Sequence, residues 1–575
     1  MRKSRSLLAL CLLPICFSHS FSGETFNEEL TIRGLPDGRV ASRFEFSTLL
    51  HGATPRNPQN LSAEDNSQHY TLFPLALGQI LREYAVTELH LTLNAGKWDY
   101  DRWGYPEEPD VATGASLWAW MAEGSAAAHG PTGRHSVDAR WRDLRNALAG
   151  LFCASIASLD EQRTTSPARA FTPLGALPAW PQSPPHAFRH ASLPSENVCT
   201  ENLTPFLKLL PCKSRSGLAH LLNPHRLFDA DWHGMGLHVS WRPEDGVQVR
   251  LTFQSVSDPL RTVTTRDWSL SSLFDRTIDR ACPVAALSRV VVTLPMREPY
   301  SIHPEPSSNA NGRGIFDLAG QPLPLDISMH WLEPFQHATI PAGQAPLSVR
   351  RMLRGSAQDH GALAVSIANA GPSPVRVVYL ETLPWIVHLY LHTLELTVDG
   401  VPRADLLEDI SYIAPVPHGR AATLEAVLTI PARSTLSLRF GVGRAFLRYT
   451  EHPPDAQRGS ELPGAVVVLL PSGSGNKTQG AGWWVSTNKG ALQRTQTQRQ
   501  EQQQQRRIYT PALLVDPATP DFSMPYNVII FTCTLVAFIF RTVFNGLTRR
   551  FAILNVPPVD GRLALQTHAL SINKI

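Results

Sequence analysis

The feature that most constrains this chain is a long apolar stretch near its C-terminal end, from Val528 to Leu547. A helix rises about 1.5 Å per residue, so a stretch of this length covers about 30 Å, the hydrocarbon thickness of a bilayer. We therefore expect one transmembrane helix over residues 526–547. The rest of the chain must then fold in water on one side of the membrane or the other.

Arg541 interrupts the apolar stretch, and an ionised side chain inside lipid costs at least about 2.5 kcal/mol on insertion scales. It lies nearer the C-terminal end, from where its long side chain can reach the interface beside Arg549 and Arg550. An interfacial arginine is the simpler interpretation. A contact to an anionic lipid or to a partner helix is the alternative.

The charges on either side of the stretch predict its orientation. Asp516 and Asp521 precede it, whereas arginines follow it at positions 549, 550 and 562. By the positive-inside rule, the tail at 548–575 lies in the cytosol.

The first 22 residues have the layout of a secretory signal peptide. A basic start precedes an apolar part from Leu7 to Phe17, and small residues follow at Ser20 and Ser22. We expect cleavage after Ser22 or Ser20, because the apolar part is too short to span a bilayer comfortably. Residues 23 to 521 are therefore predicted to lie in a secretory lumen or outside the cell.

An ectodomain of about 500 residues exceeds what one hydrophobic core usually serves, so two or more packed modules are expected. The formal net charge of +3 is small and is not concentrated in one block. Nothing in this charge pattern indicates nucleic-acid binding.

Periodic stretches predict the nature of the modules. Alternating apolar and polar residues predict strands at 88–94, 247–253, 424–430 and 436–442. The stretch 386–400 predicts a long strand or a pair of strands that ends in an Asp399–Gly400 turn. Helical periodicity predicts helices at 73–84 and 136–148, the second behind Ser136 as N-cap. We expect a β-rich α+β ectodomain, with an α+β module at 23–235 and an antiparallel β-sandwich module at 236–515.

Three polar stretches read as linkers. Residues 51–67, the proline-rich 172–194 and the glutamine-rich 494–507 have too little apolar surface to fold alone. We interpret 494–507 as a flexible insertion in the second module.

Four of the seven cysteines belong to the predicted ectodomain, namely Cys153, Cys199, Cys212 and Cys282. They allow two internal bridges in three ways, or fewer bridges with one sulfur facing another chain. In "VCTENLTPFLKLLPC", Pro205 can begin a short helix that Pro211 ends, which would permit a Cys199–Cys212 loop without requiring it. No two of the four stand at the spacing of a zinc site.

Glycosylation sequons occur at Asn60, Asn202 and Asn476. Asn60 and Asn476 lie in polar, turn-rich surroundings and are the candidate acceptors. Asn202 is expected to stay unmodified, because Pro205 restricts Thr204 to extended conformations.

The sequence gives no clear sign of catalysis. No hydrolase, metalloprotease, Walker or dinucleotide motif appears in a fitting context. Cys153, in "GLFCAS", is the best candidate nucleophile, but Phe152 and Ile156 favour a buried structural sulfur there. His388 and His392 have a spacing that suits a metal on a helix, yet they lie in a strand-like run. We expect no catalytic residues, no cofactor and no metal site.

Several strings in the chain resemble the PIG-T family, the membrane-anchored, non-catalytic subunit of glycosylphosphatidylinositol (GPI) transamidase. They match in the same order from about residue 25 to 550: "HYTLFPLALGQIL", "LHLTLNAGKWDYDRWG", "GASLWAWM", "LAGLFCASIASLD", "VCTENLTPFLKLLPCKSRSGLAHLL", "LPWIVHLYLHTL" and "PDFSMPYNVI". Two parts of them, "CTENLTPFLKLLPC" and "DFSMPYNV", are highly specific. The glutamine-rich insertion and the loop at 51–67 depart from the family pattern.

The resemblance implies a role in the endoplasmic reticulum membrane, in a complex that joins proproteins to a GPI lipid. It implies that the catalytic cysteine and histidine belong to a separate caspase-like subunit, and that other membrane subunits complete the assembly. It also implies an interchain disulfide at Cys199, a bond from Cys212 to Cys282 and a buried free thiol at Cys153.

Two other classes of function stay open on the residues alone. A membrane-anchored thiol hydrolase would use Cys153 or Cys199 itself. A cell-surface adhesion or receptor ectodomain would share the single span and the sandwich-like strands.

Overall fold

The structure is a computed structural model, and it describes residues 23–61, 63–124, 136–180, 186–261, 265–295, 298–310, 312–333, 335, 345–355, 357, 359–452, 459–470, 506–518 and 523–549. The predicted signal peptide at 1–22, most of the glutamine-rich insertion and the tail from 550 onward lie outside these residues. The chain divides into two compact units, Met1–Ala518 and Thr519–Ile575.

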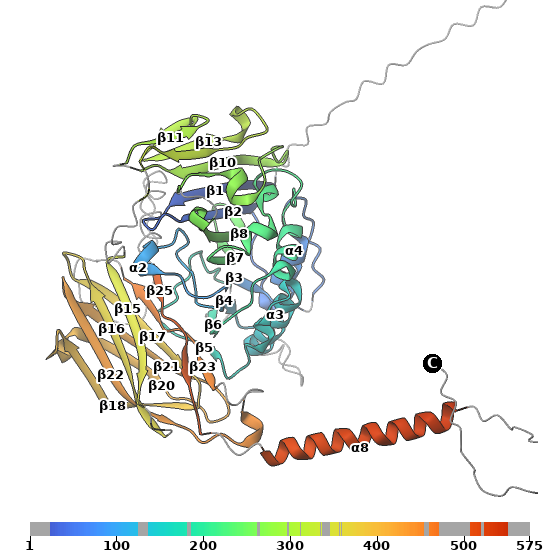
Figure 1. The fold of residues 1–575 in the computed structure, drawn as a ribbon, viewed down its shortest axis with the longest axis vertical. Coiled ribbons are helices and arrows are strands. Elements are labelled where there is room, and N and C mark those ends of the chain that lie inside the picture. The colour runs from blue at the N-terminus through green and yellow to red at the C-terminus, as the bar shows by residue number, and fades with distance from the viewer. Residues whose placement is uncertain are drawn as a thin grey trace, which may run out of the picture. The chain divides into compact units, whose positions relative to one another are not determined.

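The first unit contains an eleven-stranded sheet, which extends in Figure 1 from β13 and β10 to β6 and β5. Strand β1 pairs with β10 in parallel, and every other neighbouring pair is antiparallel. In spatial order the strands are β12 (Ser308–Ala310), β13 (Arg313–Asp317), β10 (Ala285–Thr293), β1 (Glu24–Gly34), β2 (Val40–His51), β8 (Gly246–Ser257), β7 (Trp232–Arg242), β3 (Val86–Asn94), β4 (Ala115–Ala122), β6 (His186–Leu193) and β5 (Thr164–Thr165).

Helices cover one face of this sheet (Figure 1). They are α1 (Leu75–Glu83), α3 (Val137–Phe152), α4 (Thr200–Lys208), α5 (Pro224–Leu227) and α6 (Leu270–Phe274), while the short α2 (Tyr100–Trp103) belongs to a second core. Helix α3 forms as its sequence predicts, because the Ser136 side chain accepts a hydrogen bond from the Ala139 N–H at 3.2 Å. Its buried Trp141, Leu144 and Leu148 lie three or four residues apart and face the sheet.

A small antiparallel sheet adjoins this core. Its order is β11 (Tyr300–His303), β14 (Ser328–Trp331) and β9 (Trp268–Ser269). Trp268 and Met329, which are cross-strand partners, are both buried in the first core.

Residues 347 to 515 contain two five-stranded sheets packed face to face, which confirms the expected antiparallel sandwich. One sheet is β15 (Leu347–Arg354), β16 (His360–Asn369), β22 (Ser434–Arg444), β18 (Val387–Val398) and β19 (Val401–Pro402). The other is β20 (Leu407–Ile413), β21 (Ala422–Ile430), β17 (Val375–Leu383), β24 (Val466–Leu469) and β25 (Arg507–Tyr509), and a two-stranded sheet of β23 (Ser460–Leu462) and β26 (Leu513–Val515) lies beside them.

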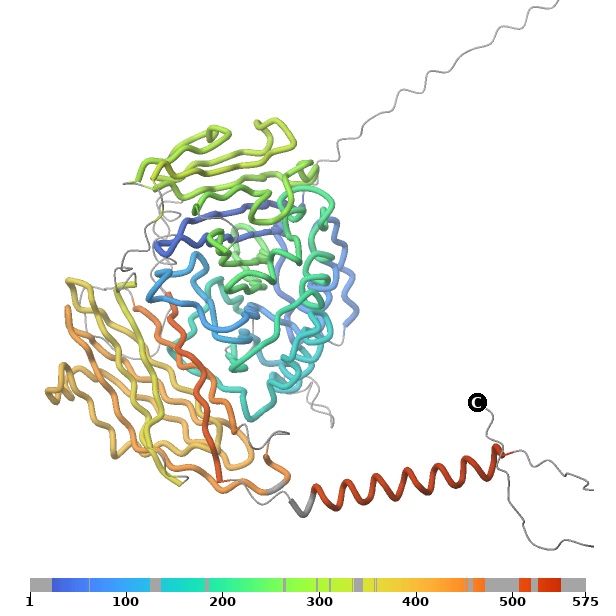
Figure 2. Tube along the Cα trace, in the orientation of Figure 1, coloured from blue at the N-terminus to red at the C-terminus, as the bar shows by residue number. Residues whose placement is uncertain are grey.

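The sandwich packs against the second face of the eleven-stranded sheet through strand β25. Figure 2 shows this late segment running alongside the chain near residue 100, where the Tyr509 N–H donates to the Tyr100 hydroxyl at 3.2 Å. The Tyr509 hydroxyl donates to the buried Asp110 carboxylate, which also accepts from Trp118 Nε1 at 3.0 Å. Because these groups are buried and mutually hydrogen-bonded, the contact between the modules is specific as well as apolar.

The module boundary expected between residues 235 and 236 falls inside strand β7. Strands β8, β10, β12 and β13 follow that point and still belong to the eleven-stranded sheet, so the sandwich begins at β15. The physical reason is that alternation predicts a strand but not its partner, and the β7–β8 hairpin inserts between β2 and β3.

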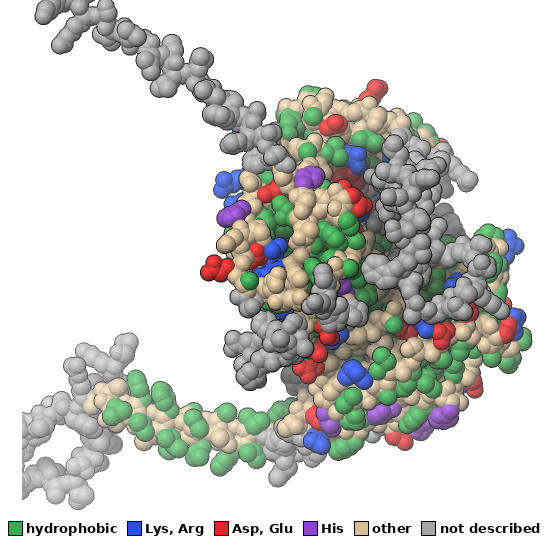
Figure 3. Space-filling view, turned by 180° about the vertical axis from the view of Figure 1, so that it is seen from behind, with side chains coloured by type: hydrophobic (Ala, Val, Ile, Leu, Met, Phe, Trp, Pro, Cys, Tyr) green, Lys and Arg blue, Asp and Glu red, His purple; other side chains and the backbone are tan. Residues whose placement is uncertain are grey.

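The second unit contains helix α8 (Ser523–Thr548). Its segment Tyr526–Thr548 has a mean hydropathy of 2.0 and is long and apolar enough to cross a membrane. Figure 3 shows hydrophobic side chains along this helix. Its exposed aromatic side chains include Phe531, Phe538 and Phe540. Such a surface is stable when lipid or other apolar helices cover it.

Candidate functional site

The candidate site is the junction between the end of α3 and the start of α4. Cys199 immediately precedes α4, and its thiol is exposed and free. The Cys199 N–H donates to Asn202 Oδ1 at 2.8 Å. Its carbonyl oxygen accepts from the N–H groups of Asn202 and Leu203, both at 3.2 Å. The backbone is therefore held on both sides of Cα, and the thiol is presented to solvent from a fixed position.

Asn202 holds the junction together. Its side chain is only 1% exposed, and its Nδ2 donates to the carbonyl oxygens of Phe152 at 2.8 Å and Cys153 at 3.2 Å. One carboxamide thus bonds the backbone of Cys199 and that of Cys153. A glycan on Nδ2 is incompatible with this packing. The reason expected from the sequence is wrong, however, because Thr204 lies inside helix α4 and is not extended.

Helix α4 begins earlier than predicted. It starts at Thr200, so the prediction that Pro205 begins it is wrong, and Pro205 lies inside the helix. Asn202 at the third helical position satisfies the Cys199 N–H and so favours the earlier start. Pro205 costs the helix one backbone donor, while the Thr204 hydroxyl bonds the Thr200 carbonyl at 2.8 Å.

Cys153 is exposed, so the expectation of a buried thiol there is wrong. It follows the last residue of α3 and has a left-handed backbone conformation, with φ at 51°. This turn ends the helix and directs the chain away from the buried face, on which Phe152 and Ile156 are packed. Phe152 and Ile156 are buried as expected, but Cys153, which lies between them in the sequence, is not.

Two further contacts hold the segment before Cys199 in place. Buried Glu196, just before Cys199, accepts from the Ser155 N–H at 3.0 Å. His233 on β7 lies with its Nε2 3.1 Å from the Val198 carbonyl oxygen. The segment before Cys199 is therefore bonded both to the segment after Cys153 and to strand β7.

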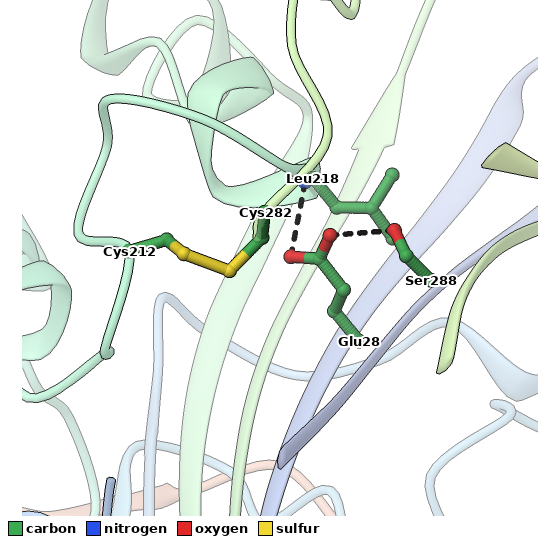
Figure 4. The surroundings of a disulfide bond; sticks show 5 residues. All are labelled: Glu28, Cys212, Leu218, Cys282 and Ser288. Carbon is green, nitrogen blue, oxygen red and sulfur yellow. Dashed lines mark hydrogen bonds between the residues drawn. A yellow bond between two sulfur atoms is a disulfide. The ribbon is translucent and has the colours of Figure 1, made fainter. Parts of the chain in front are cut away.

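The end of the α4 segment is covalently fixed. Figure 4 shows the disulfide between Cys212 and Cys282, whose Cα atoms are 6.0 Å apart. The bond spans 70 residues and joins the segment after α4 to the segment before β10. A Cys199–Cys212 loop, which the sequence permitted, is absent, since Cys212 is already bonded and Cys199 is free.

Glu28 on β1 lies beside this disulfide (Figure 4). Its carboxylate accepts from the Leu218 N–H at 3.1 Å and from Ser288 Oγ at 2.5 Å. Gly217 passes so close, with φ at +70°, that a Cβ there would lie 2.5 Å from the carboxylate oxygens. Burial raises the pKa of Glu28 to about 7, although the hydrogen bonds from Ser288 and Leu218 oppose the rise.

The remaining predicted site residues lie far from this junction in the sequence. Asn60 is exposed at the end of a short 3-10 helix, Pro58–Asn60. Asn476 lies outside the described residues. Arg541 is an exposed residue of α8, whereas His388 and His392 lie on strand β18, as their sequence pattern predicts.

The sequence did not reveal the residues that build the junction. Asn202 was interpreted only as a sequon, although in the structure it occupies the third helical position, where a capping-box residue lies. Its bond to the Phe152 carbonyl crosses 50 residues and leaves no local pattern. The same holds for Glu196 and Ser155.

The chemistry that the junction offers is that of a surface thiol. An exposed cysteine in an oxidising compartment can exchange or form a disulfide with another chain. Within the ranges that the structure describes, no group of three or more His, Cys, Asp or Glu side chains could hold a metal ion.

Comparison with known proteins assigns the chain to a family. The model of the family described as "Gpi16 subunit, GPI transamidase component" matches residues 9–258 and 254–560. The human protein described as "GPI-anchor transamidase component PIGT" is 34% identical over 92% of this chain and 91% of its own length. The Schizosaccharomyces pombe "GPI transamidase component PIG-T homolog" is 30% identical over 96% and 95%, and the Saccharomyces cerevisiae "GPI transamidase component GPI16" is 28% identical over 91% and 88%. With matches that run through both the eleven-stranded sheet and the sandwich, the chain belongs to the Gpi16/PIG-T family of GPI transamidase components.

Proposed function

We propose that this chain is a non-catalytic subunit of the GPI transamidase complex, which attaches GPI anchors to proproteins in the endoplasmic reticulum membrane. Family membership over nearly the whole chain supports this role. In this proposal the catalytic cysteine and histidine lie in a caspase-like subunit, and other membrane subunits, the GPI lipid and the proprotein complete the assembly.

The observation that carries the proposal is the presentation of Cys199. Its thiol is exposed and free, while the backbone around it is fixed by Asn202. A thiol held in this way suits an interchain disulfide to the caspase-like subunit. Once this bond has formed, further contacts between the two chains are intramolecular, so the two luminal domains stay together at high effective concentration.

The apolar helix supports a single-pass arrangement with the ectodomain in the lumen. Tyr526–Thr548 is long enough to span, and the arginines at 549, 550 and 562 favour a cytosolic C-terminal tail. Arg541 lies towards that end of α8. In the proposal it contacts a lipid headgroup or a partner helix at the interface.

The experiment is a non-reducing gel of the full-length chain from cells that also express the other subunits. The wild-type chain should run as a heavier species that dithiothreitol converts to the monomer. Cys199→Ser should abolish this species, whereas Cys533→Ser, which alters an exposed thiol on α8, should leave it unchanged.

The Cys212–Cys282 bond serves as the folding control, because a misfolded variant would lose it as well. Persistence of the heavy species in a correctly folded Cys199→Ser chain would remove the tether from the proposal.

A further inference from the structure

Two exposed thiols lie at one junction. Of the cysteines in the described part of Met1–Ala518, Cys153 and Cys199 are free and exposed, while Cys212 and Cys282 are bonded to each other. They come from segments 46 residues apart, one at the end of α3 and the other at the start of α4.

The fold holds these two segments together independently of any disulfide. The Asn202 carboxamide bonds the backbone of both cysteines, through Nδ2 to the Cys153 carbonyl and through Oδ1 to the Cys199 N–H. Glu196 adds a second link by accepting from Ser155, two residues beyond Cys153. All of these contacts are made by backbone groups or by buried side chains, so the neighbourhood of the two thiols is a property of the folded core.

Both cysteines are exposed residues at helix ends, so their side chains can rotate. Cys153 follows the last turn of α3 and Cys199 precedes the first turn of α4. Helix ends open more readily than helix interiors. A disulfide needs the two Cα atoms within about 7 Å. Opening of the Asn202 contacts at these helix ends supplies such an approach, while the Glu196–Ser155 and Val198–His233 contacts keep the two segments adjacent and anchored.

We propose that Cys153 is a resolving thiol for Cys199. This inference rests on the proposed interchain disulfide at Cys199. The Cys153 thiolate attacks the Cys199 sulfur, the interchain S–S bond breaks, and its electron pair leaves with the partner's sulfur. That sulfur takes up the proton that Cys153 lost, and a Cys153–Cys199 bond remains. One disulfide is exchanged for another, so the step needs no added oxidant or reductant.

The exchange makes the tether reversible. In a chain without its partner, the Cys153–Cys199 bond forms by exchange with a disulfide of the oxidising compartment, which is reduced to two thiols in the same step. An incoming partner thiolate reopens the internal bond by attack on the Cys199 sulfur, and Cys153 leaves as the thiolate. Cys153 therefore competes with the partner for Cys199. The competition is strong because an intramolecular thiol has a high effective concentration.

The experiment maps thiols and disulfides in the full-length chain in native membranes. Samples come from cells expressing the chain alone and from cells expressing it with the other transamidase subunits. Free thiols are trapped rapidly with N-ethylmaleimide, and the chain is digested and mapped without reduction. In the chain expressed alone, we expect a linked pair of peptides that contain Cys153 and Cys199.

Two variants sharpen the test. Cys153→Ser should abolish the linked pair and increase the heavy interchain species at least about twofold when the partner is limiting, because the competing intramolecular reaction is lost. Cys533→Ser should change neither readout. An intact Cys212–Cys282 peptide pair in the same digest shows that each variant is folded.

The outcomes separate this inference from the proposed function. A heavy species together with complete alkylation of Cys153 in both samples, and no effect of Cys153→Ser, would overturn the resolving role and leave the tether. A linked Cys153–Cys199 pair without any heavy species would instead remove the tether, and with it the exchange, while still showing that the two thiols can bond.

Discussion

At the scale of single residues, Glu28 couples protonation to the stability of the first module. Its carboxyl group is buried between Leu218, Ser288 and the Cys212–Cys282 bond (Figure 4). Burial raises the pKa of Glu28 from 4.5 to about 7. The folded chain therefore binds this proton more tightly than the unfolded chain, and the contribution of Glu28 to stability is lost as the pH rises from about 4.5 through 7.

Replacing Glu28 by Gln should stabilise the chain at alkaline pH. Gln mimics the neutral carboxyl, so the variant and the wild type should be similarly stable at pH 4.5. At pH 8 the variant should gain up to roughly 3 kcal/mol, the free energy that corresponds to the raised pKa. Denaturant unfolding of the full-length chain at a series of pH values measures this difference.

Glu29→Gln is the matched control. Glu29 is the next residue of β1 and forms an ion pair with Arg289, with Nη2 and Oε2 2.5 Å apart. Its substitution should give no gain at alkaline pH. A constant difference between Glu28→Gln and wild type from pH 4.5 to 8 would contradict the linkage.

At the scale of elements, sequence periodicity predicted individual helices and strands but not their partners. The helix at 136–148 and the strands at 247–253 and 436–442 correspond to α3, β8 and β22, because side-chain periodicity directly reflects which face is buried. The parallel pairing of β1 with β10 joins residues about 260 apart. No local pattern records such a pairing, and for this reason the predicted module boundary fell inside β7.

The candidate site was predictable to a similar degree. Cys199 was singled out through a specific string, and the resemblance paired Cys212 with Cys282 as the structure does. The exposure of Cys153 depends on a left-handed residue at the end of α3. The flanking apolar residues do not indicate that turn, because their pattern shows only that their own side chains are buried.

Strand β25 makes a contact between modules that can be tested with one hydroxyl. Tyr509→Phe removes the donor to buried Asp110 and leaves that carboxylate with fewer partners. The loss should cost about 1–3 kcal/mol, the usual penalty for an unsatisfied buried group. Hydrogen exchange should rise at 507–509 and in the facing strand β4, as mass spectrometry of the full-length chain can measure.

Tyr300→Phe is the control for this substitution, because Tyr300 lies half-buried on the edge strand β11. It should leave exchange at β25 unchanged. Equal exchange in the wild type and Tyr509→Phe would show that the hydroxyl does not hold the modules together.

At the scale of the whole molecule, the proposal places the entire first unit in the lumen, and Asn60 can report this. Asn60 is exposed, and in the lumen it should carry a glycan that endoglycosidase H removes. Asn60→Gln should abolish one step of the mobility shift on a denaturing gel. An unmodified Asn60 in a chain that has entered the membrane would contradict the predicted orientation of α8.

The 70-residue span of the Cys212–Cys282 bond has a consequence for the order of events during biosynthesis. In the proposed orientation, Cys199 and Cys212 enter an oxidising lumen ahead of Cys282. Premature closure of a Cys199–Cys212 bond would consume the thiol proposed to bind the partner chain. Strand β1 is synthesised first, and its parallel pairing with β10 likewise cannot form until β10 has been made. A chain interrupted before residue 293 lacks a complete β10 and the rest of that sheet edge, so the sheet cannot be completed until this segment has been made.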